Sequence, residues 1–188
     1  MRQKILVANF PLLVANTVFG GTFTARLTQE VRAKRGWSYG AYSSLGYDRR
    51  RQAFSMWTFP KAEDAAACMA LELEMLTDWW QTGITADELA WAKRYLQQSQ
   101  AFSCDTAPKR LGLELDELTS DLPPGHYARF VASVGDVTLE QANRAIQSRI
   151  SLDDLTIVVV GTHDAIGDEV RQAIPGLGEE RIVPFDAE

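Results

Sequence analysis

The sequence predicts an α+β fold in which helices cover one face of a mostly antiparallel, mixed sheet. Two strand-like segments flank a short charged turn early in the chain, several stretches carry apolar residues at helical spacing, and one late run is continuously apolar and β-branched. With 188 residues, 46% of them hydrophobic, the chain can bury the core of one domain. No linker rich in Gly, Ser and Pro divides it, so residues 1–188 are treated as a single domain.

The first two elements are predicted to be helices. Pro11 suits a first helical turn and the pair Gly20 and Gly21 suits a helix end, which predicts a short buried helix between them. A second helix is expected over residues 23–35, and Gly36 ends it. The glycine pair is interpreted as a helix stop and tight turn rather than as a ligand-binding loop.

A β-hairpin is predicted next. Residues 39–47 and 52–59 form its two strands, joined by a turn over residues 48–51 that carries a run of three arginines. Pro60 ends the second strand. We expect both faces of that strand to be covered, because large apolar side chains occupy both alternating positions: Phe54, Met56, Trp57 and Phe59.

Most of the remaining chain has helical periodicity. Residues 63–81 predict a long helix, with an apolar stripe formed by Ala66, Met69, Leu73, Leu76 and Trp80. Thr85 with Glu88, and Thr138 with Gln141, have the spacing of capping boxes that open two further helices. Between them, Leu111, Leu115 and Leu118 form another helical stripe.

The end of the chain predicts one strand buried on both faces. Residues 155–161 form an apolar, β-branched run of the kind found in central strands. A short helix over residues 164–173 and an edge strand over residues 181–184 are expected to follow.

Composition excludes several classes of function. The net charge of −6 and the pI of about 5.0 argue against nucleic-acid binding. Cys68 and Cys104 are too few for a disulfide framework, and His126 and His163 have no partner at metal-ligand spacing. We therefore expect no cofactor or metal in this chain.

The N-terminus leaves two interpretations open. A charged start followed by an apolar run resembles a secretory signal peptide, but Asn9, Pro11 and Asn16 interrupt the run and no small-residue cleavage site follows. A buried helix is the favoured interpretation, and the run is too short to span a membrane.

Arg32 and Tyr39 are the candidate site residues. Arg32 lies near the end of the second helix and Tyr39 at the start of the first strand, so both side chains can converge on one point. Guanidinium and phenol groups are donors suited to a carbonyl oxygen that becomes an oxyanion. The alternative is structural, with Arg32 a helix-end cation and Tyr39 a packed aromatic.

The ordered motifs resemble the second domain of M16 zinc peptidases, the family of pitrilysin, insulin-degrading enzyme and mitochondrial processing peptidase. The resemblance spans nearly the whole chain and rests on residues 14–21, 23–27, 31–39, the helix start at Val137 and Thr138, and residues 155–161. It departs at Trp37, where the family usually has a smaller aliphatic residue.

The resemblance implies the non-metal half of a zinc endopeptidase. In that family this half supplies an arginine and a tyrosine, which correspond to Arg32 and Tyr39, and a partner domain bearing H-x-x-E-H supplies zinc and base. That motif is absent from this sequence. The chain is therefore expected to be a fragment or subunit of a larger module and inactive alone, acting on extended peptides with its partner.

Two alternatives stay open beside this one. The chain could be a non-catalytic scaffold or interaction subunit of M16 type, or an exported α+β binding module that begins with a signal peptide. Formation of a homodimer also stays open. The resemblance implies a periplasmic or secreted location, because bacterial relatives are often exported, with a cytoplasmic one left open.

Overall fold

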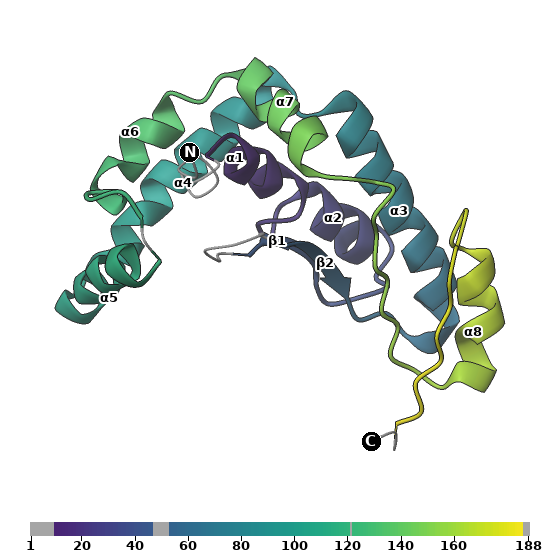
Figure 1. The fold of residues 1–188 in the computed structure, drawn as a ribbon. Helices are drawn as coiled ribbons and strands as arrows, with labels where there is room; N and C mark the ends of the chain where they lie inside the picture. Colours follow the sequence, from purple (N-terminus) through teal and green to yellow (C-terminus); the bar gives the residue numbers. More distant parts are fainter. Residues whose placement is uncertain (1–9, 47–52, 121, 186–188) are drawn as a thin grey trace.

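The computed structural model describes residues 10–46, 53–120 and 122–185. Within this part of the chain lie eight α-helices, a π-helical segment and one two-stranded antiparallel sheet (Figure 1). The predicted α+β class is therefore right in its hairpin and its covering helices. The sheet is smaller than expected, and the described residues contain no parallel strand pair.

Among the described residues, only helices follow the hairpin. In chain order the elements are α1 (Phe10–Phe19), α2 (Arg26–Thr28), the π-helical segment η1 (Gln29–Lys34), β1 (Ala41–Leu45), β2 (Phe54–Thr58), α3 (Ala65–Thr82), α4 (Ala86–Ser103), α5 (Ala107–Thr119), α6 (Phe130–Gly135), α7 (Leu139–Arg149) and α8 (His163–Gln172), with short 3-10 turns at Ala62–Asp64 and Tyr127–Arg129. Residues 1–9 and the predicted hairpin turn at 48–51 lie outside the described residues. The charged start of the signal-like segment is thus not described, whereas its second half forms the buried helix α1.

Helix α1 is central and packs against α4, α7 and β1 (Figure 1). It ends where the N–H groups of Gly20 and Gly21 both donate to the carbonyl oxygen of Asn16, at 3.0 and 2.8 Å. A Cβ atom on Gly20 would lie 2.4 Å from Ser43 Oγ and 2.6 Å from Leu27 Cδ1. The glycine pair thus acts as the predicted helix stop, and Gly20 also permits close approach of β1.

The inner face of the hairpin packs on the helices through three stacked aromatic rings. Phe19 of α1 stacks on Trp79 of α3 with ring centroids 4.4 Å apart, and Phe54 of β2 lies 5.8 Å from Trp79. Only this face is covered. Trp57 is 45% exposed and Phe59 71% exposed, so the prediction that both faces of the second strand are covered was wrong. The alternating pleat places Trp57 opposite Phe54, where no described element packs.

Helix α3 turns a different stripe inward from the predicted one. The buried residues are Cys68, Glu72, Leu76 and Trp79. The expected residues Met69, Leu73 and Trp80 lie beside this line and are half-buried. Two apolar stripes run side by side on this helix, and the stacking of Trp79 on the hairpin selects between them.

Local capping chemistry is confirmed at both predicted helix starts. Thr85 and Glu88 form a capping box at α4, and Thr138 and Gln141 form one at α7. Each satisfies backbone N–H groups that have no partner within the helix. The predicted tail helix is also present as α8.

The two predicted strands at the end of the chain were wrong. Residues 155–160 and 181–184 are irregular, and Val158 and Val160 are 79% and 94% exposed. A β-branched run becomes a strand only where a neighbouring strand accepts its backbone hydrogen bonds. The described sheet consists of the hairpin alone and offers this run no such pairing.

Helix α5 lies at the end of the molecule farthest from α8 (Figure 1). The predicted leucine stripe on it is exposed, with Leu111, Leu115 and Leu118 at 60, 50 and 76%. The Glu117 carboxylate anchors the helix by accepting hydrogen bonds from the N–H groups of Gly125 and Tyr127, at 2.9 and 2.8 Å.

Candidate functional site

Arg32 lies in the π-helical segment η1, which continues α2 without a break. π-helical turns are rare in proteins, and those that occur are often found at functional sites. The segment ends at Lys34, and Gly36 follows with a φ of 69°, in the left-handed region that favours glycine. There the N–H of Gly36 donates to the carbonyl of Arg32 at 3.0 Å, and the N–H of Trp37 donates to the carbonyl of Val31 at 3.1 Å. The chain then turns back toward the hairpin.

The structure brings Arg32 and Tyr39 together. The Arg32 guanidinium carbon lies 4.4 Å from the centroid of the Tyr39 ring and 4.2 Å from that of the Phe23 ring. The cation is therefore held between two aromatic faces, each worth roughly 0.5–1 kcal/mol at an exposed site. Tyr39 is 80% exposed and Phe23 51% exposed, so the group stands at the surface. We call these three residues the clamp.

Buried hydroxyl groups fix the backbone on which the clamp stands. Ser38 Oγ accepts hydrogen bonds from the N–H groups of Gly40 and Phe59, at 3.3 and 3.1 Å, and donates to the Gly40 carbonyl at 2.7 Å. Thr28 Oγ1 donates to the carbonyl of Ala41 at 2.8 Å. These bonds join the helix that carries Arg32 to the strand that follows Tyr39.

One guanidinium nitrogen of the clamp lacks a hydrogen-bond partner. Arg32 Nη1 is shielded from solvent and has no hydrogen-bond partner among the described residues. An unpaired buried donor costs about 1–3 kcal/mol, so a shift of the side chain that brings Nη1 to an acceptor would be favourable. A guanidinium beside a phenol can hold a carbonyl oxygen and the negative charge that develops on it.

Sequence reasoning did not assign two residues of this site. Phe23 forms the second wall around Arg32, and Ser38 positions the loop that carries Tyr39. A signal for Phe23 was its position at the start of the predicted helix, nine residues before Arg32. No sequence signal identifies Ser38, because its partner Phe59 is 21 residues further along the chain, directly after β2.

The described residues offer no metal centre of their own. They contain no group of three or more His, Cys, Asp and Glu side chains that could hold a metal ion. His126 is buried against Phe10, with ring centroids 5.5 Å apart, and burial lowers its pKa although Glu117 opposes this. Burial, and then the nearby Glu72, raise the pKa of the Cys68 thiol to about 11, which keeps it protonated and a poor nucleophile. None of the described helices combines the length and apolar character needed to cross a bilayer.

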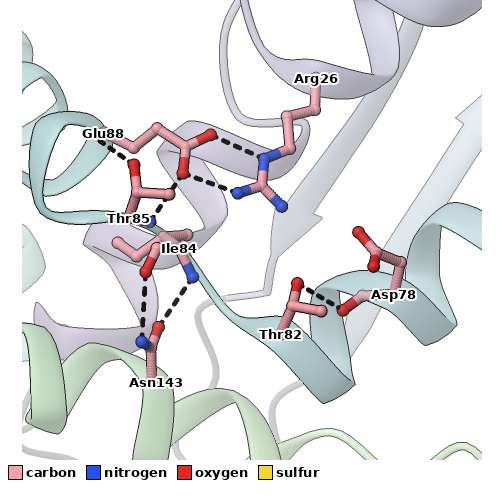
Figure 2. A network of polar contacts seen from close by, with 7 residues as sticks. All are labelled: Arg26, Asp78, Thr82, Ile84, Thr85, Glu88 and Asn143. Atoms are coloured by element: carbon pink, nitrogen blue, oxygen red, sulfur yellow. Dashed lines mark hydrogen bonds and ion pairs between the residues drawn. The ribbon is translucent and has the colours of Figure 1, made fainter.

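A second surface feature is an open cleft of about 960 Å³ between η1 and helices α3 and α4. Arg26 lines this cleft and donates hydrogen bonds to both carboxylate oxygens of Glu88, at 2.8 and 2.6 Å (Figure 2). Burial alone would raise the pKa of Glu88, but Arg26 and the N–H of Thr85 outweigh it and lower that pKa. The ion pair ties α2 to the start of α4, and thereby the helix that carries Arg32 to the core.

The loop beneath this ion pair is fixed by a second polar contact. Asn143 of α7 accepts a hydrogen bond from the Ile84 N–H at 2.8 Å and donates to the Ile84 carbonyl at 3.2 Å (Figure 2). The cleft lacks Arg32 and Tyr39 among its lining residues. We interpret its charged wall as structural support for the clamp.

Comparison with known proteins decides the family. Residues 6–96 match the model of the peptidase M16 inactive domain, a range that includes the whole clamp and the hairpin. The chain belongs to the M16 peptidase inactive domain family. A solved M16 inactive domain from Pseudomonas fluorescens superposes with a TM-score of 0.68 at 27% identity, covering 77% of this chain and 34% of that one.

Curated M16 relatives carry two kinds of description. The chain is 31% identical over 143 residues to an uncharacterized zinc protease of Mycobacterium bovis, covering 74% of this chain and 32% of the relative. It is 24% identical over 143 residues to YmxG of Helicobacter pylori, described as a non-peptidase homologue, covering 76% of this chain and 33% of the relative. The chain thus spans a third or less of the length of these relatives.

Proposed function

We propose that this chain is the non-metal half of an M16-type zinc endopeptidase and that its clamp holds the scissile peptide group. Arg32 and Tyr39 would donate hydrogen bonds to the carbonyl oxygen and bind more tightly as negative charge develops there. The observation that carries the proposal is the Arg32 guanidinium held between the exposed rings of Phe23 and Tyr39, beside the Tyr39 phenol.

The metal belongs elsewhere in this proposal. The described residues do not fit a zinc ion, since no cluster of suitable ligands exists among them. A partner domain with H-x-x-E-H, on the same polypeptide or as a separate subunit, would hold the ion and the general base. We expect the chain alone to bind no stoichiometric zinc and to cleave no peptide.

Cleavage of a quenched fluorescent peptide library by this chain together with its natural H-x-x-E-H partner tests the proposal. Arg32→Ala and Tyr39→Phe should each lower kcat/KM at least a hundredfold, in the range of about 100- to 1000-fold found when one oxyanion donor is removed. Arg94→Ala and Tyr95→Phe are matched controls, because these exposed neighbours on α4 lie outside the clamp and should leave cleavage unchanged. Activity that is indifferent to both clamp variants would refute the proposed role.

A non-catalytic scaffold is the second candidate, favoured by the likeness to the non-peptidase homologue of Helicobacter pylori. It predicts a stable complex with another M16 domain and no dependence of any cleavage on Arg32 or Tyr39. Retention of the clamp argues against it, because a scaffold has no need for an arginine and an exposed tyrosine placed side by side. The same library assay distinguishes the two functions.

A further inference from the structure

The outer face of the hairpin, on the side away from the helices, carries a row of aromatic side chains. Tyr42 and Trp57 are directly opposite in the register of β1 and β2, with ring centroids 4.9 Å apart. Phe59 follows two residues after Trp57, and their rings lie 5.4 Å apart. We call these three residues the aromatic row.

The solvent exposure of the aromatic row is unfavourable in free energy. Trp57 is 45% exposed and Phe59 71% exposed. Phe, Tyr and Trp each bury about 150–250 Å² when covered, so an uncovered row forgoes several kcal/mol of apolar burial. Exposed aromatic groups in contact with one another mark binding surfaces more often than isolated apolar residues do.

The backbone of the aromatic row is tied to the backbone that carries Tyr39. Ser38 accepts hydrogen bonds from the N–H of Phe59 and that of Gly40, so one hydroxyl fixes the backbone on both sides of Tyr39 and the end of the row. Gly40 leaves room for the Tyr42 ring, since a Cβ atom there would lie 2.4 Å from Tyr42 Cε2. The row therefore begins next to the residue that carries the phenol of the clamp.

The chemistry of this surface selects its occupant. The remaining outward residues of the hairpin are Ser44 and Ser55, so this face of the two strands presents rings and hydroxyl groups and no charge. A charged side chain would lose hydration here without gaining an ion partner. An aromatic or large aliphatic side chain gains burial on the rings and matches the neutral surroundings.

We propose that the aromatic row is a specificity subsite for an aromatic or large aliphatic side chain of the peptide held by Arg32 and Tyr39. This inference rests on the proposed function. Tyr42 lies three residues beyond Tyr39, at most about 10 Å of extended chain, so a peptide held at the clamp can reach the row with a side chain a few residues from the scissile bond. Trp57 is the central residue of the subsite.

The test profiles cleavage by this chain with its natural H-x-x-E-H partner, using peptides that vary one position at a time over four residues on each side of the cleaved bond. Wild type should prefer Phe, Trp or Leu over Ala, Ser or Asp at one such position by at least fivefold in kcat/KM. Trp57→Ala and Phe59→Ala should each remove most of this preference and leave the preferences at the other positions unchanged. Phe102→Ala is the control, because Phe102 is 72% exposed at the far end of α4.

The outcomes separate this inference from the proposed function. If Arg32→Ala abolishes cleavage while Trp57→Ala and Phe59→Ala leave the profile as in wild type, the subsite is refuted and the clamp stands. If both row variants lower cleavage of every peptide equally and weaken the complex measured by analytical ultracentrifugation, the row contacts the partner domain and the subsite is refuted. If Arg32→Ala and Tyr39→Phe leave the rate of cleavage unchanged, the proposed function itself is refuted, and the subsite with it.

Discussion

The two faces of the hairpin differ in what they contact. On the inner face Phe54 meets Phe19 and Trp79 within the core, and those side chains are covered. On the outer face Trp57 has the same kind of aromatic neighbours, yet it remains 45% exposed. Similar residues thus serve stability on one side and, in our account, recognition on the other. The difference lies in whether the chain itself covers the rings.

Replacing the central ring of the inner face should have the largest effect on stability. Trp79→Ala removes a fully buried side chain from between Phe19 and Phe54 and leaves a cavity, which costs about 3–5 kcal/mol. Urea unfolding followed by circular dichroism measures the loss. Trp79→Phe should cost less than the alanine variant, because it keeps an aromatic ring against Phe19 and leaves a smaller cavity. Equal losses in the two variants would contradict this packing.

The buried carboxyl group of Glu72, on α3, should make the stability of the protein depend on pH. Burial raises the pKa of Glu72 from 4.5 to about 7, and Oε1 has no hydrogen-bond partner among the described residues. Between these two pH values the folded state keeps a proton that the unfolded state releases, so stability falls as pH rises and the loss is complete above pH 7.

Glu72→Gln should therefore stabilise the protein at pH 8 by up to about 3 kcal/mol and change little near pH 4.5. Denaturant midpoints measured across this pH range test the expectation. Glu74→Gln, at an exposed position two residues further along α3, is the control and should leave the pH profile unchanged. Parallel profiles for wild type and Glu72→Gln would show that Glu72 titrates normally.

A smaller loss is expected where α1 meets the hairpin. Gly20→Ala places a methyl group 2.4 Å from Ser43 Oγ and 2.6 Å from the Ser43 nitrogen, so the backbones must separate. Overpacking of this kind costs about 1–3 kcal/mol, measured as a lower denaturant midpoint. Gly112→Ala is the matched control, because nothing lies within 4 Å of a Cβ atom there. If the Gly20 variant is as stable as the Gly112 variant, α1 and β1 can separate at Ser43 without a loss of stability.

The smallest change is expected on the outer face. Trp57→Ala removes a ring of the same type as Trp79, but it should alter the free energy of unfolding by only about 1 kcal/mol because the ring is half solvated. Thermal unfolding of the two alanine variants side by side measures the contrast. A loss at Trp57 as large as that at Trp79 would assign the outer row to the core and remove the reason to propose a subsite there.

Local chemistry in the sequence predicted much of this fold. The hairpin, the glycine stops and both capping boxes follow from residues close together in the chain, and so does the proximity of Arg32 to Tyr39. Features that depend on tertiary packing could not be predicted from the sequence. The stacking of Trp79 decides which stripe of α3 is buried and which face of the hairpin is exposed, and the run at residues 155–160 lacks the paired strand that its composition predicts.

The candidate site shows the same division. Arg32 and Tyr39 were identified as a pair because a helix, a glycine stop and a strand start bring them close along the chain. Phe23 and the aromatic row became visible only once the exposed face was known. The role of all these residues in catalysis and specificity stays a prediction.

Binding of a transition-state analogue tests the central claim most directly. A phosphinic peptide places a tetrahedral, anionic group where the oxyanion would form. If the clamp binds that charge, Arg32→Ala should raise the inhibition constant of the phosphinic peptide by about the same factor, at least a hundredfold, by which it lowers kcat/KM for the matching substrate. A large loss of kcat/KM with an unchanged inhibition constant would contradict the account and place Arg32 outside the oxyanion site.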